Sequence, residues 1–96
     1  CKMKKMYRAV LSKKLKEKRK TIDLIDRKLL NLLNRRFRIA LEIGRIKKKM
    51  GEKVYDPVRE KEILERLRLR NKGSLKEKDL ERIFRTIMSV CRKSQE

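Results

Sequence analysis

Apolar residues recur at intervals of three and four along the first half of the chain, which is the spacing of one face of an α-helix. Between about Tyr7 and Met50 there is no proline, and the only glycine is Gly44. We predict one helix of roughly 40 residues there, about 60 Å long at 1.5 Å per residue. A chain of this size cannot cover so long a stripe alone, so we expect a partner helix from a second subunit. The stripe consists of Leu15, Ile22, Ile25, Leu29, Leu32, Leu33, Ile39, Ala40, Ile43 and Ile46.

Turn-forming residues end this helix and begin a second one. Gly51 stops the first helix, and Asp56-Pro57 starts the next. Aspartate accepts hydrogen bonds from the free amides of a first turn, and proline fits the first helical position. The second helix is expected to run to about Lys72, with Gly73 ending it.

A third helix follows the sequence SLKE, in which Ser74 and Glu77 have the spacing of a capping box. One side of this helix is apolar, and no internal repeat is visible. The predicted fold is therefore all-α: a three-helix chain with one long N-terminal helix, forming an intertwined helical-bundle dimer. The apolar side of the third helix contains Leu80, Ile83, Phe84, Ile87 and Met88.

When each apolar stripe is extended at its own spacing, it runs into polar side chains. For most of these we favour a structural explanation over a functional one. Arg19 and Lys47 can snorkel from the ends of a stripe, Asp56 can act as a cap, and Arg59 and Glu60 can form a solvated first turn. Cys91 can act as a small apolar residue, and Gln95 can lie at a fraying terminus. The exception is Arg36, because its apolar neighbours leave it no easy route to solvent. An arginine there needs a buried anionic partner. The residues concerned are Arg19, Asp26, Arg36, Lys47, Asp56, Arg59, Glu60, Cys91 and Gln95.

Helix geometry limits what an anionic partner of Arg36 could be. Lys47 lies eleven residues further on, points the same way and is about 16 Å away along the axis, which leaves room for a small ligand. Arg19 lies about 25 Å from Arg36, so it reaches the same ligand only from a second, antiparallel subunit. Gly44 has two explanations, close helix packing and space for a ligand beside Lys47, and the sequence does not choose between them.

Composition narrows the chemistry. The 96 residues suffice for one small domain. The net charge of +19 has several explanations: it can serve solubility, or it can serve binding to nucleic acid, to an anionic membrane surface or to a small polyanion. With no histidine and no nucleophile–base pair, covalent catalysis is not expected. The two cysteines have no metal-type spacing, so we expect a reducing, cytoplasmic setting and no metal or cofactor. No segment is long and apolar enough for a membrane span, and we expect no membrane partner.

Several segments together resemble the all-helical chorismate mutases. They are IDLIDRKLLNLLNRR, EIGRIK, YDPVREKEILERL and IFRTIMSVCRKSQ, in this order, and the match runs from about Arg19 to Gln95. The resemblance implies an intertwined homodimer that converts chorismate to prephenate by a pericyclic rearrangement, without cofactor or covalent intermediate. Residues 1–18 are then a basic extension of the first helix, and residues 19–96 the mutase-like domain.

The resemblance also implies roles for the polar residues of the stripes. Arg36 and the partner's Arg19 would hold the two carboxylates of the substrate. Lys47 and Gln95 would donate to the ether oxygen, where negative charge develops.

At the start of the second helix, Asp56 and Glu60 would bind the ring hydroxyl, with Arg59 beside them. Cys91 departs from the family pattern, since a small polar residue such as serine commonly stands there and helps to bind a carboxylate.

The sequence leaves two other functions open. The basic segment KKLKEKRK would suit a helical nucleic-acid-binding module. The sequence shows no known DNA- or RNA-recognition motif, so we expect nucleic acid to be at most an incidental partner. A non-catalytic regulatory domain with a degenerate mutase site would explain Cys91 and the position of Gln95 near the end of the sequence. Members of this family also occur fused to prephenate-processing or other shikimate-pathway domains, so the resemblance leaves open a longer parent protein with such a domain.

Overall fold

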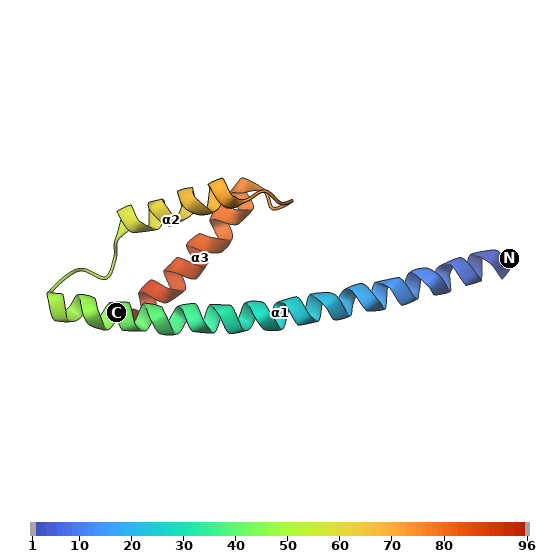
Figure 1. Ribbon diagram of the computed structural model, residues 1–96, viewed down its shortest axis with the longest axis horizontal. Helices are drawn as coiled ribbons and strands as arrows, with labels where there is room; N and C mark the ends of the chain where they lie inside the picture. Colours follow the sequence, from blue (N-terminus) through green and yellow to red (C-terminus); the bar gives the residue numbers. More distant parts are fainter. Residues whose placement is uncertain (1, 96) are drawn as a thin grey trace. The chain divides into compact units, whose positions relative to one another are not determined.

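The computed structural model describes residues 2–95, and within them it contains three α-helices and no strand. Helix α1 spans Lys2–Met50, α2 spans Pro57–Arg70 and α3 spans Glu77–Gln95 (Figure 1). The predicted all-α, three-helix chain with a long first helix is confirmed. Helix α1 has 49 residues and begins earlier than predicted, since no helix-breaking residue stands between Lys2 and Tyr7.

The chain divides into two compact units, Cys1–Arg36 and Phe37–Glu96. In its described part, the first unit is the N-terminal portion of α1. The second unit contains the end of α1 together with α2 and α3.

The first unit is a helix whose apolar stripe faces solvent in the single chain. Every described side chain up to Leu32 is exposed, including Ile22 at 58% and Leu29 at 50%. A single helix cannot bury a stripe against itself, so these side chains stay in water unless another element covers them.

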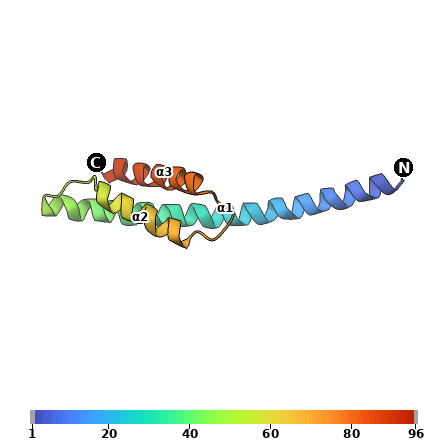
Figure 2. The same ribbon diagram turned by 90° about the horizontal axis from the view of Figure 1, so that it is seen from above.

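In the second unit, α2 packs against α3, and the end of α3 reaches the last turns of α1 (Figures 1 and 2). The small core contains Ala40 from α1 and Leu80, Met88 and Cys91 from α3. A Cβ atom added to Gly44 would lie 2.8 Å from Cγ of Gln95, which is closer than two carbon atoms normally approach. The close-packing explanation of Gly44 is therefore confirmed: the absence of a side chain lets α3 approach α1 here.

The boundaries between the helices follow the turn signals closely, with one exception. Gly51 has a positive φ of 71°, and the amide of Arg59 donates to the carboxylate of Asp56 at 3.0 Å, so the predicted stop and cap are confirmed. The Ser74 capping box is wrong. Helix α3 begins at Glu77, so Ser74 lies outside the cap position.

A different residue organises the connection between α2 and α3. Asn71 follows directly after α2, which ends two residues earlier than predicted. Its side-chain amide donates to the carbonyl of Leu75 at 2.7 Å, and its side-chain oxygen accepts from the amide of Gly73 at 3.3 Å. These local bonds satisfy the backbone of the turn, which leaves Ser74 without a capping role.

Candidate active site

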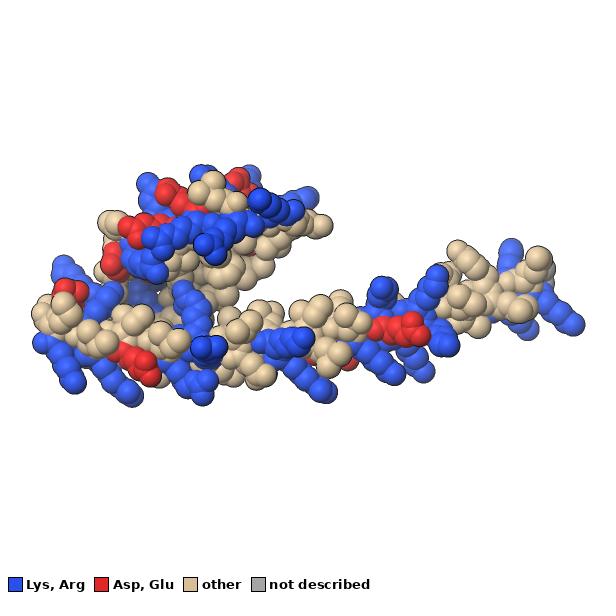
Figure 3. Space-filling model, viewed as in Figure 1, with Lys and Arg blue, Asp and Glu red and all other residues tan. Residues whose placement is uncertain are grey.

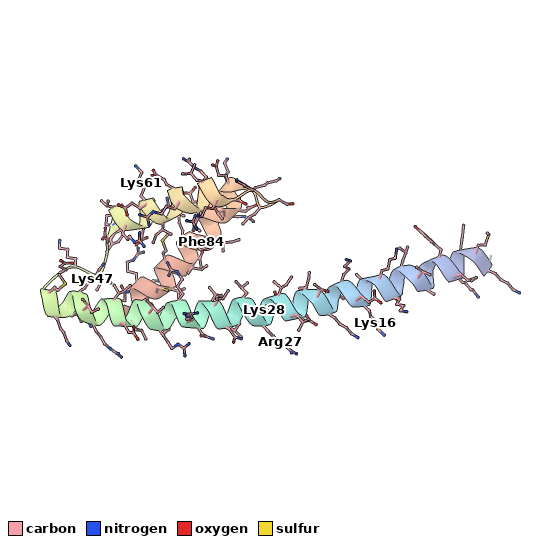
Figure 4. All side chains as sticks on the ribbon, viewed as in Figure 1. Lys16, Arg27, Lys28, Lys47, Lys61 and Phe84 are labelled. Atoms are coloured by element: carbon pink, nitrogen blue, oxygen red, sulfur yellow. The ribbon has the colours of Figure 1, made fainter. Side chains whose placement is uncertain are left out.

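Lys47 stands in the last turn of α1, on the side that meets the loop leading to α2 (Figure 4). Its ammonium group donates to the carbonyl of Val54 at 3.1 Å, and the side chain is half-buried. The positive charge is thus held at a fixed place beside the start of α2. A neutral carbonyl is a weaker acceptor for an ammonium group than an anion is, so an anionic ligand would compete for this donor.

The start of α2 is built around Asp56 and Pro57. Asp56 is half-buried and caps the helix, as its bond to the amide of Arg59 shows. The side chain of Arg59 is exposed and forms an ion pair with Glu62 at 3.6 Å, one turn further along the same helix. The cap fixes the direction in which α2 leaves the loop, and Arg59 lies on the solvent side.

Glu60 forms an ion pair with Arg92 of α3, a residue that the sequence analysis did not select. The guanidinium group of Arg92 donates to the carboxylate of Glu60 at 2.7 Å. The same guanidinium lies over the ring of Tyr55, 4.4 Å from its centre. Both partners of the ion pair are largely shielded, with 26% of the Arg92 side chain and 20% of the Glu60 side chain exposed. This bond joins α2 to α3 next to the end of the loop.

One signal in the sequence could have found Arg92. It stands four residues after Met88 and three before Gln95, which are helical spacings that place it beside the apolar side of the third helix. The sequence pattern selected Cys91 instead, because Cys91 lies on the apolar stripe of the third helix itself. Which of several arginines near a stripe meets a carboxylate of another helix depends on the packing of the two helices.

Cys91 and Gln95 lie on the last turns of α3. Cys91 is buried, and its carbonyl accepts a hydrogen bond from the hydroxyl of Ser94 at 2.6 Å. Gln95 is half-buried, and its side-chain amide donates to the carbonyl of Ala40 on α1. The glutamine side chain therefore anchors the end of α3 and presents its amide group to α1.

Within the second unit, the ammonium of Lys47, the amide of Gln95 and the carboxylates of Glu60 and Asp56 are thus each held by a hydrogen bond. The two arginines predicted to hold the carboxylates belong to the first unit. Arg19 is exposed there, and Arg36, its last residue, is half-buried. Hydrogen-bond donors with fixed positions and no nucleophile–base pair are suited to orienting an anionic molecule and stabilising charge that develops on it.

Comparison with known proteins identifies the family. The family model for chorismate mutase type II matches residues 18–96. The chain belongs to this family. The match covers α2, α3 and most of α1, and it begins within one residue of the point at which the sequence resemblance begins.

Curated relatives agree with this assignment. The chain is 43% identical over 81 residues to a bifunctional chorismate mutase/prephenate dehydratase from Aquifex aeolicus, an alignment that covers 80% of this chain and 22% of that protein. A protein of the same name from Neisseria gonorrhoeae is 42% identical over 73 residues, covering 76% of this chain and 20% of the relative. A chorismate mutase from Methanocaldococcus jannaschii is 46% identical over 55 residues, covering 57% of this chain and 56% of the relative. The chain spans about a fifth of the length of the bifunctional relatives that it matches.

Proposed function

We propose that this chain catalyses the rearrangement of chorismate to prephenate. The observation that carries the proposal is the match of the chorismate mutase type II model to residues 18–96, the segment that contains every residue with a proposed role at the site. The substrate has two carboxylates, and a chain with a net charge of +19 attracts it over long distances. A non-covalent mechanism agrees with the residues available, since the sequence has no histidine to act as a general base.

In this proposal, Lys47 and Gln95 stabilise the transition state. Both side chains already donate hydrogen bonds, Lys47 to the carbonyl of Val54 and Gln95 to the carbonyl of Ala40. When the substrate binds, its ether oxygen replaces these neutral acceptors. As the C–O bond breaks, negative charge grows on that oxygen, and the two donors then stabilise the transition state more than the ground state.

The other proposed contacts bind and orient the substrate. Arg36 holds one carboxylate and Arg19 of a second copy holds the other, while the ring hydroxyl lies against Asp56 and Glu60. Holding both ends of a flexible substrate in the reactive conformation lowers the entropic part of the barrier. Arg59 and Cys91 stand beside this set, and the carboxylate contact near Cys91 comes from the backbone or is weaker than a hydroxyl would give.

The proposed active enzyme is a homodimer. The exposed stripe of the first unit supports this assembly, because a second copy of the same helix offers an equally apolar face to cover it. The names of the relatives also support a longer parent protein in which a prephenate dehydratase domain consumes the product.

The direct test follows the disappearance of chorismate with the wild-type chain and with Arg36→Ala and Lys47→Ala. Each substitution removes a donor to the substrate and is expected to lower kcat by about 10²–10³. Lys49→Ala is the matched control, because Lys49 is an exposed lysine in the same turn as Lys47. Wild-type activity in both variants would remove the site assignment, and an inactive wild-type dimer that binds no chorismate would support the regulatory alternative.

A further inference from the structure

The first turns of α1 carry an apolar face that is wider than the stripe assigned to the dimer. It consists of Met3, Met6, Tyr7, Val10 and Leu11, which we call the N-terminal apolar face. All five side chains are between 45% and 78% exposed. The family model begins at residue 18, so this face lies entirely outside the part of the chain that the family shares.

The N-terminal apolar face is wider than a seam between two paired helices. At 100° per residue, its five positions cover an arc of about 140°. Met3, Tyr7 and Leu11 continue the stripe, which begins at Leu15, at intervals of four residues. Met6 and Val10 form the other edge of the arc, and the next positions at their spacing are the charged residues Lys13 and Glu17. The edge formed by Met6 and Val10 therefore ends in charge and does not continue into the stripe. A second copy that covered the stripe would leave this edge in water.

Basic side chains border the N-terminal apolar face on both sides. Lys4 projects next to Leu11, and Lys13 projects next to Met6 on the opposite edge. Lys2, Lys5 and Arg8 occupy the rest of the circumference, and residues 2–16 contain no acidic side chain. In Figure 3 the N-terminal part of α1 accordingly shows blue and tan atoms side by side.

These two properties together select the kind of partner. A helix with a broad apolar face and a lysine- and arginine-rich polar face lies in the interface of an anionic lipid bilayer, where the apolar side chains enter the acyl boundary and the cations meet the headgroups. Nucleic acid would use the cations and leave the apolar face in water. Nothing about the face requires a spanning helix, and no helix among residues 2–95 is long and apolar enough to cross a membrane.

We propose that residues 2–14 form an interfacial helix that attaches this protein reversibly to anionic membrane surfaces. The expectation of no membrane partner came from the absence of a spanning segment, and a helix that lies on the surface needs none. The apolar face is only three turns long, so attachment requires both apolar insertion and anionic headgroups and is sensitive to salt. The proposal is independent of the proposed catalytic function, because none of these residues belongs to the site.

The test is co-sedimentation of the whole chain with vesicles of phosphatidylcholine, with and without phosphatidylglycerol. We expect binding only to the vesicles that contain phosphatidylglycerol. Met6→Ser/Val10→Ser removes two apolar side chains without changing charge and is expected to weaken that binding by about tenfold or more. Ala9→Ser, on the opposite side of the helix, is the matched control and is expected to bind as the wild type does. Chorismate turnover in solution is expected to stay unchanged in both variants.

Several results would overturn the proposal. One is a wild-type chain that fails to bind the anionic vesicles at low salt. Another is a Met6→Ser/Val10→Ser variant that binds the anionic vesicles as well as the wild type does. The contact would then depend on charge alone, and the same variant would also bind duplex DNA as the wild type does. A third is a lower mass of the assembly in this variant by light scattering, since the face would then be covered by a second copy.

Discussion

At the scale of single residues, Arg92 is the side chain of α3 that contacts both the loop before α2 and the first turn of α2. It joins the start of α2 to α3 by its bond to Glu60 and extends over the ring of Tyr55. An ion pair that is mostly shielded from water and supported by an aromatic ring is worth more than one on the surface. Arg85 offers the contrast: its ion pair with Glu81 is nearly as short, 2.8 Å against 2.7 Å, but lies on an exposed part of the same helix. We therefore infer that Arg92 positions Glu60.

Replacing Arg92 by methionine tests this inference. Arg92→Met keeps much of the side-chain volume and removes the bond to Glu60, so kcat/KM for chorismate is expected to fall by about tenfold. Glu60→Gln is expected to lower kcat/KM as well, and the double variant to lose less than the two single losses combined, because both changes break the same bond. Arg85→Met is the control and is expected to leave kcat/KM unchanged. Additive losses in the double variant would show that Arg92 acts independently of Glu60.

Gly44 gives a second prediction at this scale. In an exposed helix, glycine to alanine stabilises by about 1 kcal/mol, because alanine restricts the unfolded chain and favours the helix. At Gly44 the new methyl group would lie 2.8 Å from Gln95, so Gly44→Ala is expected to lower the free energy of unfolding by about 1–3 kcal/mol. Urea denaturation measures this, with Ser12→Ala on the exposed part of α1 as a control that is expected to gain a little stability. A stabilised Gly44→Ala variant would mean that α3 does not pack on α1 at this point.

At the scale of the elements, the turn between α1 and α2 controls the site. Gly51 ends α1 with a positive φ, Asp56 caps α2, and the six-residue connection from Gly51 to Asp56 carries the carbonyl of Val54 that accepts from Lys47. The ends of two helices and one of the proposed catalytic side chains are therefore coupled through a short piece of backbone. A change in the cap moves the start of α2 and with it Glu60.

Asp56→Ala is expected to affect both stability and activity. Loss of the cap costs about 1 kcal/mol, since the amide of Arg59 loses its acceptor. Asp56→Asn keeps a capping oxygen and is expected to restore most of the stability, but its effect on KM reports on the proposed contact with the ring hydroxyl. If the two variants have the same KM and differ only in stability, Asp56 is a cap and no more.

At the scale of the whole molecule, the apolar stripe of the first unit is the feature that calls for an assembly. Its side chains up to Leu32, which include Ile22, Ile25 and Leu29, are exposed in the single chain. Exposed apolar surface of this extent on a charged chain of 96 residues marks an interaction face. The proposed dimer covers the stripe and supplies Arg19 to the site of the partner.

Lysine substitutions at two adjacent positions, one on the stripe and one off it, test the dimer. Leu29→Lys places a charge on the stripe and is expected to halve the mass of the assembly and to abolish most of the chorismate turnover. Leu30→Lys makes the same substitution on a neighbouring residue that is also exposed but lies off the stripe, and it is expected to change neither. Sedimentation velocity measures the mass. An unchanged mass for Leu29→Lys would exclude the stripe as the dimer interface.

The sequence by itself determined the three helices, their order and most of their ends. Periodicity, Gly51, Asp56 and Pro57 act over a few residues, so their effects can be predicted without knowing the fold. The polar residues within the stripes, such as Lys47 and Gln95, were also visible from local spacing. The match of the family model to residues 18–96 agrees with what these patterns indicated.

Only the tertiary structure decided which of the many charged residues meet. Arg92 and Glu60 are 32 residues apart in the sequence, and Gln95 and Ala40 are 55 apart. Contacts over such separations depend on the angle and register at which helices pack, and with 47% charged residues the chain offers many alternative pairs. The same holds for Gly44, whose two explanations were equal in the sequence and were separated by the approach of a single side chain from α3.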